Sequence, residues 1–299
     1  MTDPAGHRTV QSMSAAAFAG IAALAKAEAG LVMPPNKLNM VQSRLRPRLA
    51  ELGLETYDQY ASFVASADGV GERRQMLSAL TTNVSHFFRE NHHFEMLREQ
   101  VLPELATRAR EGKSVRIWSA GCSSGQEPYS IAMTILEHAP ELAALDTLIL
   151  ATDIDPRILE TAAAGRYSEN QITTIPEPMA ARHLHEAANQ FSVNDTVRKL
   201  VRFRELNLFN PWPMRTRFDI IFCRNVVIYF DSETQNSLWP RFEAALRPDG
   251  WLFLGHSERV SDSYSRRFRT VGMTAYRPQA ANTTTVQQAI EKEEPYGTA

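Results

Sequence analysis

The residues best placed to do chemistry follow two apolar runs that are typical of buried strands. The stretch VRIWSAGCSSGQEPYS, residues 115–130, reads as a strand, a tight loop containing Gly121 and Gly125, and the start of a helix that carries Glu127. Asp153 directly follows the second run, residues 147–152. Cofactors of open parallel sheets bind at the carboxyl ends of the strands, where a carboxylate can accept from ribose hydroxyls. The pattern predicts a site for an adenosine-type cofactor.

The spacing within the loop separates two kinds of cofactor. A dinucleotide site requires G-x-G-x-x-G around a pyrophosphate, whereas here three residues separate Gly121 from Gly125. Glu127 would also repel a pyrophosphate. S-adenosylmethionine has no phosphate, and its ammonium and sulfonium charges are compatible with nearby carboxylates. We therefore favour the methyl donor over a nicotinamide, with an ordinary strand-to-helix turn as the simpler alternative.

Composition excludes several classes of protein. The chain has 299 residues, enough for two domains, with 43% hydrophobic and 22% charged residues, as in globular proteins. A formal net charge of −2 argues against nucleic acid as a partner. No apolar run approaches the ~18 residues of a membrane span, so we expect a cytoplasmic protein without membrane insertion. We also expect a monomer.

The periodicity of apolar residues changes near residue 110. Before it, the spacing predicts helices over residues 14–29, 36–51, 56–66, 71–80 and 91–108; after it, strands alternate with helices, which predicts a mostly parallel α/β sheet. The expected organisation is a helical domain at 1–80 that recognises the substrate, a connector with a linking helix at 81–112, a sheet domain at 113–279 with an insertion at about 167–205, and a disordered tail at 280–299.

Two further motifs add polar groups. TTNVSHFFRE, residues 81–90, places hydrogen-bonding side chains, two aromatic residues and Arg89 in the connector. FCRNVVIYF, residues 222–230, follows an apolar strand, so Asn225 and Tyr229 are expected at its carboxyl edge. The simpler interpretations, a packed hinge and a core tyrosine, remain open.

Five motifs in this order, TTNVSHFFRE, WSAGCSSGQEPYSIA, ATDID, FCRNVVIYF and LGHSE, resemble those of the CheR-type chemotaxis receptor methyltransferases over roughly residues 15–277. The resemblance implies a small helical domain followed by a doubly wound, Rossmann-like methyltransferase domain with a small inserted antiparallel β subdomain. It also implies methyl transfer from S-adenosylmethionine to glutamate γ-carboxylates on the cytoplasmic helical bundle of chemoreceptors. The products are a glutamate methyl ester and S-adenosylhomocysteine.

The resemblance assigns roles to matching residues. Glu127 would take the donor ammonium, Asp153 the ribose, and Asn207 with Leu208 the adenine. The other expected donor contacts are Asn83, Ser85, Arg89, Gly121, Asn225 and Val226. Because a glutamate is already deprotonated at neutral pH, the reaction requires alignment and exclusion of water rather than a base. Arg89, which can orient a carboxylate through two hydrogen bonds, and Tyr229, which can exclude water, are the expected catalytic residues.

Basic residues of the helical domain offer a substrate surface. Lys37, Arg44 and Arg48 fall on one face of the helix expected at 36–51, with Arg46 nearby, and could attract acidic receptor helices. A solvated charged face is the alternative. Pro47 should kink or split this helix.

Other interpretations are weaker. The NPWP sequence at residues 210–213 is similar to a motif of amino-group methyltransferases but precedes the strand that it should follow. A regulatory protein that binds S-adenosylmethionine without catalysis would not need the intact set of polar residues. Family members that dock on a receptor pentapeptide have a glycine-bearing loop in the inserted subdomain; residues 190–207 contain no glycine, which indicates a pentapeptide-independent enzyme. His86, His92 and His93 lack cysteine or carboxylate partners at ligand spacing, so no metal site is expected.

Overall fold

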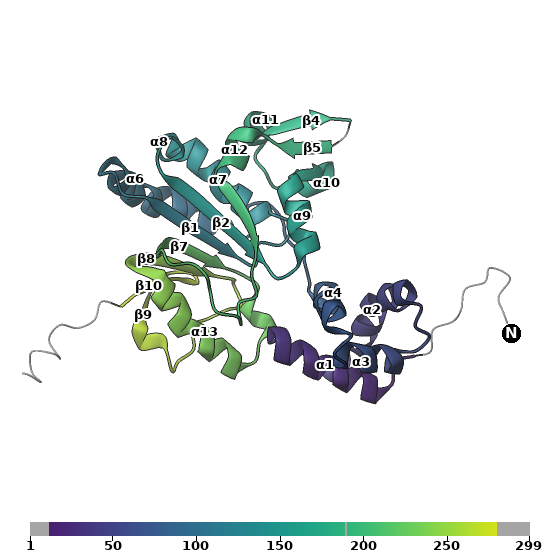
Figure 1. Ribbon diagram of the computed structural model, residues 1–299. Helices are drawn as coiled ribbons and strands as arrows, with labels where there is room; N and C mark the ends of the chain where they lie inside the picture. Colours follow the sequence, from purple (N-terminus) through teal and green to yellow (C-terminus); the bar gives the residue numbers. More distant parts are fainter. Residues whose placement is uncertain (1–11, 189, 280–299) are drawn as a thin grey trace, which may run out of the picture.

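The computed structural model describes residues 12–188 and 190–279, so the tail expected at 280–299 lies outside the described residues (Figure 1). The helical domain consists of α1 (Ala15–Ala29), a 3₁₀ turn (Pro35–Lys37), α2 (Leu38–Leu52), α3 (Tyr57–Ala65) and α4 (Val70–Leu80). Ser14 caps α1 by accepting from the Ala17 amide, and Thr56 forms a capping box with Gln59 at α3. These caps explain why α1 and α3 begin close to the predicted residues.

Helix α2 runs through Pro47 without a break, so the expectation that this proline splits the helix is wrong. A proline lacks the N–H that would bond the carbonyl four residues earlier, here Ser43. Both Ser43 and Pro47 are exposed, and water can therefore satisfy that carbonyl.

A connector leads from α4 to the sheet. It continues into α5 (His92–Met96), one π-helical turn (Leu97–Val101) and α6 (Leu102–Arg110), which together occupy the region expected to be one linking helix. Pro103 lies in the first turn of α6, where its missing N–H costs little.

A seven-stranded sheet in the order β6-β2-β1-β7-β8-β10-β9 forms the second domain. Its first five strands in that order are parallel, and β10 runs antiparallel to both β8 and β9. The strands are β1 (Val115–Ala120), β2 (Thr147–Asp153), β6 (Val201–Glu205), β7 (Phe218–Cys223), β8 (Leu246–Leu254), β9 (Phe268–Gly272) and β10 (Ala275–Pro278). The predicted α/β class with a helical first domain is confirmed.

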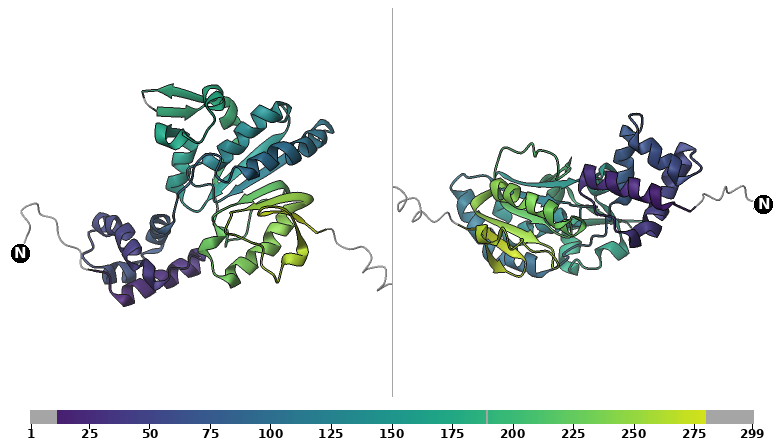
Figure 2. Two further views of the ribbon diagram at one scale, coloured as in Figure 1. Left: turned by 180° about the vertical axis from the view of Figure 1, so that it is seen from behind. Right: turned by 90° about the horizontal axis from the view of Figure 1, so that it is seen from below.

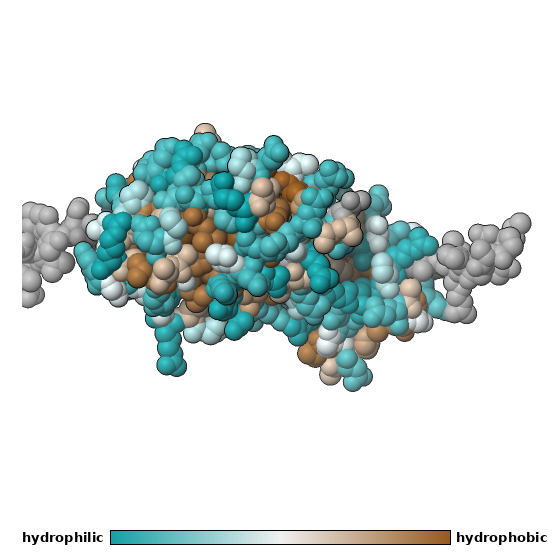
Figure 3. All heavy atoms as spheres, turned by 90° about the horizontal axis from the view of Figure 1, so that it is seen from above, coloured by the Kyte–Doolittle hydropathy of each residue, from teal (hydrophilic) through white to brown (hydrophobic). Residues whose placement is uncertain are grey.

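Helices cover both faces of the sheet (Figure 1, Figure 2). Residues of α6 and of α7 (Gln126–His138) share one apolar core with alternate side chains of β1 and β7, whereas α13 (Ser232–Ala245) shares the other core with the helical domain. Two further helices, α8 (Pro140–Ala143) and α9 (Pro156–Ala164), flank β2 in the chain. The face of the molecule shown in Figure 3 is largely hydrophilic, with apolar side chains in smaller patches.

The inserted subdomain is a three-stranded antiparallel sheet in the order β3-β5-β4, as expected. It comprises β3 (Arg166–Ser168), α10 (Glu169–Ile172), α11 (Glu177–His183), β4 (Leu184–Ala187) and β5 (Gln190–Val193), and α12 (Asp195–Lys199) follows it. The expected boundary at residue 205 is too late, because β6 pairs in parallel with β2 from Val201 to Glu205 and belongs to the main sheet.

Helix α1 ends against the carboxyl edge of the main sheet (Figure 1). The Val32 amide donates to the Tyr229 carbonyl at 2.9 Å, and the Asn207 side chain donates to the Glu28 carbonyl at 2.7 Å. Lys26 forms an ion pair of 2.6 Å with Asp231. Among the helices described, none combines the length and apolar character needed to cross a bilayer.

Candidate active site

A cavity lies where the helical domain, the connector and the carboxyl ends of β1, β2 and β7 meet. Every residue that the sequence analysis assigned to the donor lines it: Asn83, Ser85, Arg89, Gly121, Glu127, Asp153, Asn207, Leu208, Asn225 and Val226. Tyr229 and Lys37 line it too, together with apolar residues of the α1–α2 segment such as Leu31 and Met40. The helical domain therefore supplies one wall of the cavity.

Asp153 is held rigidly at the end of β2. Its Oδ2 accepts from the Ser123 amide at 2.8 Å and its Oδ1 from the Asp155 amide at 3.1 Å. Burial raises the pKa of Asp153 to about 6, although these backbone N–H groups oppose the rise. An acceptor fixed in this way can bind a diol without reorganising.

Position 121 requires a glycine both because of its backbone conformation and because no space is left for a side chain. Its φ is +83°, and a Cβ on it would lie 2.3 Å from Cγ2 of Val226. The loop after β1 can thus approach the loop after β7 closely, which brings two walls of the cavity together.

Glu127 presents a partly buried carboxylate from the first turn of α7. Its Oε1 accepts from the Ser119 hydroxyl at 2.6 Å, and its Oε2 lies 3.3 Å from Nη1 of Arg224. Burial raises the pKa of Glu127, and Arg224 opposes that rise. A carboxylate in such surroundings is suited to an ammonium group, which would supply a second positive charge.

The connector closes another side of the cavity. The Asn83 side chain donates to Oδ2 of Asp155 at 3.0 Å, and the Asn83 carbonyl accepts from the Ser123 hydroxyl at 3.1 Å. The Arg89 guanidinium donates to the Val84 carbonyl at 3.0 Å and is half-buried. Arg89 lines the cavity, and no other group in the described part of the chain takes up its remaining donors.

The segment expected at the adenine is held by its own side chains. Oδ1 of Asn207 accepts from the Phe209 amide at 2.9 Å, and the Leu208 carbonyl accepts from the Trp212 indole at 3.1 Å. Trp212 packs edge-on against Trp118 at a centroid distance of 4.7 Å. The NPWP sequence is accordingly a packed loop before β7, and this placement argues against an amino-group methyltransferase.

Sequence reasoning missed three buried charged residues that shape the cavity. Asp155 joins the connector to the sheet, and Arg224 contacts Glu127. Glu258 accepts amide hydrogens from Gly255 at 2.6 Å and from Asn225 and Val226 at 2.8 Å, and it thereby holds Asn225 at a φ of +58°. The signals were present in the ATDID, FCRN and LGHSE motifs, in which Asp155, Arg224 and Glu258 were given no role.

The basic face expected on α2 is not a single exposed surface. Arg48 is only 5% exposed and pairs with Glu72 at 2.6 Å, and Arg44 donates to the Leu80 and Thr81 carbonyls. These two arginines stabilise the helical domain and the start of the connector, so the prediction that both contact substrate is wrong for Arg48. Lys37 and Arg46 are exposed.

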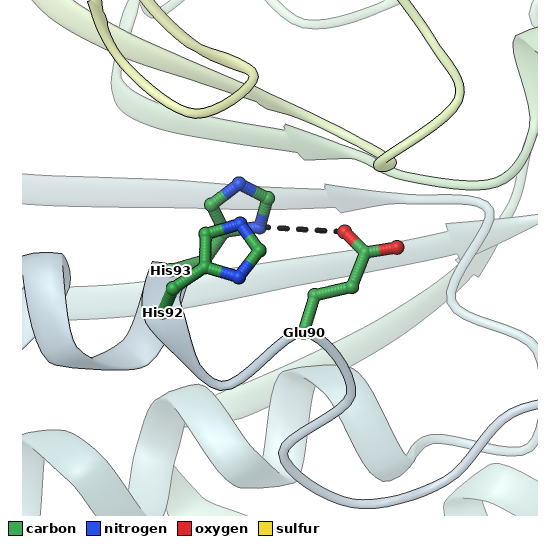
Figure 4. Close-up of side chains that lie close together, drawn as sticks. All are labelled: Glu90, His92 and His93. Carbon is green, nitrogen blue, oxygen red and sulfur yellow. Dashed lines mark ion pairs between the residues drawn. The ribbon is translucent and has the colours of Figure 1, made fainter.

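Three side chains with electron-pair donors gather beside the cavity. Ligand atoms of Glu90, His92 and His93 lie within 4.8 Å of one another, and Nδ1 of His93 is 3.7 Å from Oε2 of Glu90 (Figure 4). The histidines therefore do have a carboxylate partner, Glu90, which the spacing in the sequence did not indicate. Burial and Arg224 lower the pKa of His93 to about 3, so its ring is neutral.

Arg224 also bears on whether this cluster suits a metal. Burial opposes ionisation of Glu90, but Arg224 and hydrogen bonds from His256 lower its pKa to about 2. The guanidinium, 3.3 Å from Oε2 of Glu90, already supplies the positive charge that a cation would bring. We assign no metal to the cluster.

Comparison with known proteins gives one consistent result. Residues 16–81 match the all-alpha domain of CheR methyltransferase, and residues 83–277 match the SAM binding domain of CheR methyltransferase. A probable chemotaxis protein methyltransferase of Rhizobium etli is 50% identical over 254 residues, which cover 84% of this chain and 95% of that protein. The chemotaxis protein methyltransferase of Escherichia coli is 37% identical over 270 residues, 89% of this chain and 91% of that protein. These matches and the cavity agree: the chain belongs to the CheR family of S-adenosylmethionine-dependent methyltransferases.

Proposed function

We propose that the protein methylates glutamate side chains on the cytoplasmic helical bundle of chemoreceptors. A γ-carboxylate oxygen attacks the methyl carbon of S-adenosylmethionine, the carbon–sulfur bond breaks, and its electron pair stays on sulfur. The products are a glutamate methyl ester and S-adenosylhomocysteine. No proton moves, because the nucleophile is already a carboxylate at neutral pH.

The observation that carries this proposal is the arrangement of charge in the cavity. Two carboxylates, the partly buried Glu127 and the buried Asp153, suit the ammonium and the ribose of the donor, while Arg89 and Lys37 are cationic groups on the lining. Among the described residues that line the cavity, the histidine and the lysine, His86 and Lys37, are exposed rather than buried where they could act as a base for an amine. The attack joins opposite charges, so a site walled by Tyr229 and apolar residues favours the transition state over the hydrated reactants.

A base-treatment assay tests the chemistry. The purified protein is incubated with methyl-labelled S-adenosylmethionine and a receptor cytoplasmic fragment, and the labelled fragment is then treated with mild alkali. A methyl ester releases labelled methanol, whereas an N-methyl group keeps the label. A fragment whose candidate glutamates are changed to glutamine provides the matched control. Label that survives alkali, or that enters the control equally, would contradict the proposal.

We also propose that catalysis needs no receptor pentapeptide. The chain has no glycine between Gly165 and Gly250, a stretch that includes the whole inserted subdomain. A receptor that lacks its last five residues should then be methylated with an unchanged KM. A KM that rises at least tenfold for the shortened receptor would show that a tether is used.

Cytoplasmic location and a monomeric state complete the proposal. The receptor segment that carries the glutamates is cytoplasmic, so the enzyme must meet it there. Light scattering at assay concentrations should give a mass near 33.6 kDa. A dimer would contradict this part of the proposal without affecting the reaction.

A further inference from the structure

Arg224 links two segments of the cavity that are far apart in the sequence. Its side chain is 2% exposed and follows β7. Nη1 lies 3.3 Å from Oε2 of Glu127 in α7, whereas Nη2 donates to the Arg89 carbonyl in the connector. Nη2 also lies 3.3 Å from Oε2 of Glu90. One guanidinium thus contacts the residue expected at the donor ammonium and the backbone of the expected catalytic arginine.

The charges around Glu127 show what this contact does. Burial raises the pKa of Glu127, and the nearby carboxylates of Glu90 and Glu258 raise it further. The neighbouring thiols, Cys122 and Cys223, have pKa values raised well above their usual range and are neutral. Arg224 is the cation that opposes these effects, and its planar fork can hold two partners in a fixed direction.

We propose that Arg224 is a positioning residue for the methyl donor: it keeps Glu127 charged and directed into the cavity, and it fixes the connector at Arg89. The inference rests on the proposed role of Glu127. It requires no contact between Arg224 and the substrate carboxylate.

The test measures binding of S-adenosylhomocysteine to the full chain by calorimetry at several pH values from 6 to 8. In Arg224→Met, Glu127 loses its cation and takes up a proton at higher pH. Below that raised pKa, affinity should fall about tenfold for each unit of pH. The comparison is with the wild type at each pH, because Asp153, with a pKa of about 6, contributes the same dependence to both proteins. Arg224→Lys keeps a charge and should bind more weakly with a pH profile close to that of the wild type.

Arg108→Met is the matched control. Arg108 pairs with the buried Asp219 in β7, and it does not line the cavity. Its loss should lower the thermal midpoint as the Arg224 change does, but leave affinity and pH profile unaltered. The Arg224 inference is overturned if Arg224→Met loses affinity equally at every pH, or matches the wild type.

A second control separates this inference from the proposed function. Glu127→Gln should bind S-adenosylhomocysteine weakly and without the added pH dependence, and the double variant with Arg224→Met should lose little more. If Glu127→Gln binds normally, the proposed donor site fails, whatever Arg224 does. If Arg224→Met does not fold, Arg224→Lys carries the test: wild-type affinity together with the wild-type pH profile would count against the inference.

Discussion

Ser78, in the last turns of α4, donates a 2.6 Å hydrogen bond to Oδ1 of Asp155, a buried carboxylate just beyond β2. The other oxygen of Asp155 accepts from Asn83, which lines the cavity. Asp155 also caps α9 through the Arg157 amide. A single side chain therefore joins the helical domain, the connector and the sheet, and it lies two residues from Asp153.

We predict that Asp155→Ala weakens donor binding about tenfold, since one lost hydrogen bond to a charged group costs about 1.5–3 kcal/mol. Loss of the helix cap adds about 1 kcal/mol of destabilisation. Calorimetric titration and thermal unfolding measure the two effects. Asn194→Ala, which removes the cap of α12 in the sheet domain away from the cavity, should lower stability alone. An equal loss of affinity in both variants would mean that Asp155 acts only as a cap.

Sequence patterns predicted what depends on local chemistry. The helices, the parallel strands and the loop after β1 follow from periodicity, caps and glycine positions. The strand end suggested the donor role of Asp153, whereas the role proposed for Glu127 came from the resemblance to the family. The pairing of Arg48 with Glu72 and the three contacts of Arg224 could not be predicted in this way. These contacts depend on which parts of the chain pack together. An arginine at a given position in the sequence can be exposed or buried, depending on that packing.

Binding of the donor should depend on pH through Asp153. Because burial raises its folded pKa to about 6, the carboxylate proposed to accept from the ribose becomes protonated as pH falls through that value. Affinity should therefore decline below pH 6. Stability changes in the opposite direction: the protonated form is favoured in the folded state, so the contribution of this group is present below the unfolded pKa and lost as pH rises through about 6.

The variant Asp153→Asn separates these effects. The asparagine keeps one acceptor oxygen and does not titrate. Its affinity for S-adenosylhomocysteine should therefore be lower than that of the wild type at pH 8 and nearly constant from pH 5 to 8. Any pH dependence due to Glu127 is measured separately in Glu127→Gln and subtracted. Calorimetry with S-adenosylhomocysteine gives the profile. A profile for Asp153→Asn that still declines through pH 6 would assign the titration to another group.

We predict that Arg89→Ala lowers kcat by about 10²-fold or more, as the loss of one positioned donor does in other enzymes, and changes donor affinity much less. Within residues 12–188 and 190–279 its guanidinium has one hydrogen bond, to Val84, so removal should leave the connector folded. Methyl transfer and calorimetry give the two quantities. Arg89→Lys should recover only part of kcat because an ammonium lacks the planar fork. Equal losses in kcat and donor affinity would mean that Arg89 contacts only the donor and not the substrate carboxylate.

The basic residues of the helical domain should separate into two groups. Arg48→Ala leaves Glu72 buried without its cation and should cost about 3–5 kcal/mol of stability. Lys37→Ala removes an exposed charge on the cavity lining, so we expect an unchanged thermal midpoint and a higher KM for the receptor. The KM effect should shrink as salt is added, because exposed charges are screened. If Arg48→Ala keeps wild-type stability, or the KM effect of Lys37→Ala is insensitive to salt, this division of the basic residues is wrong.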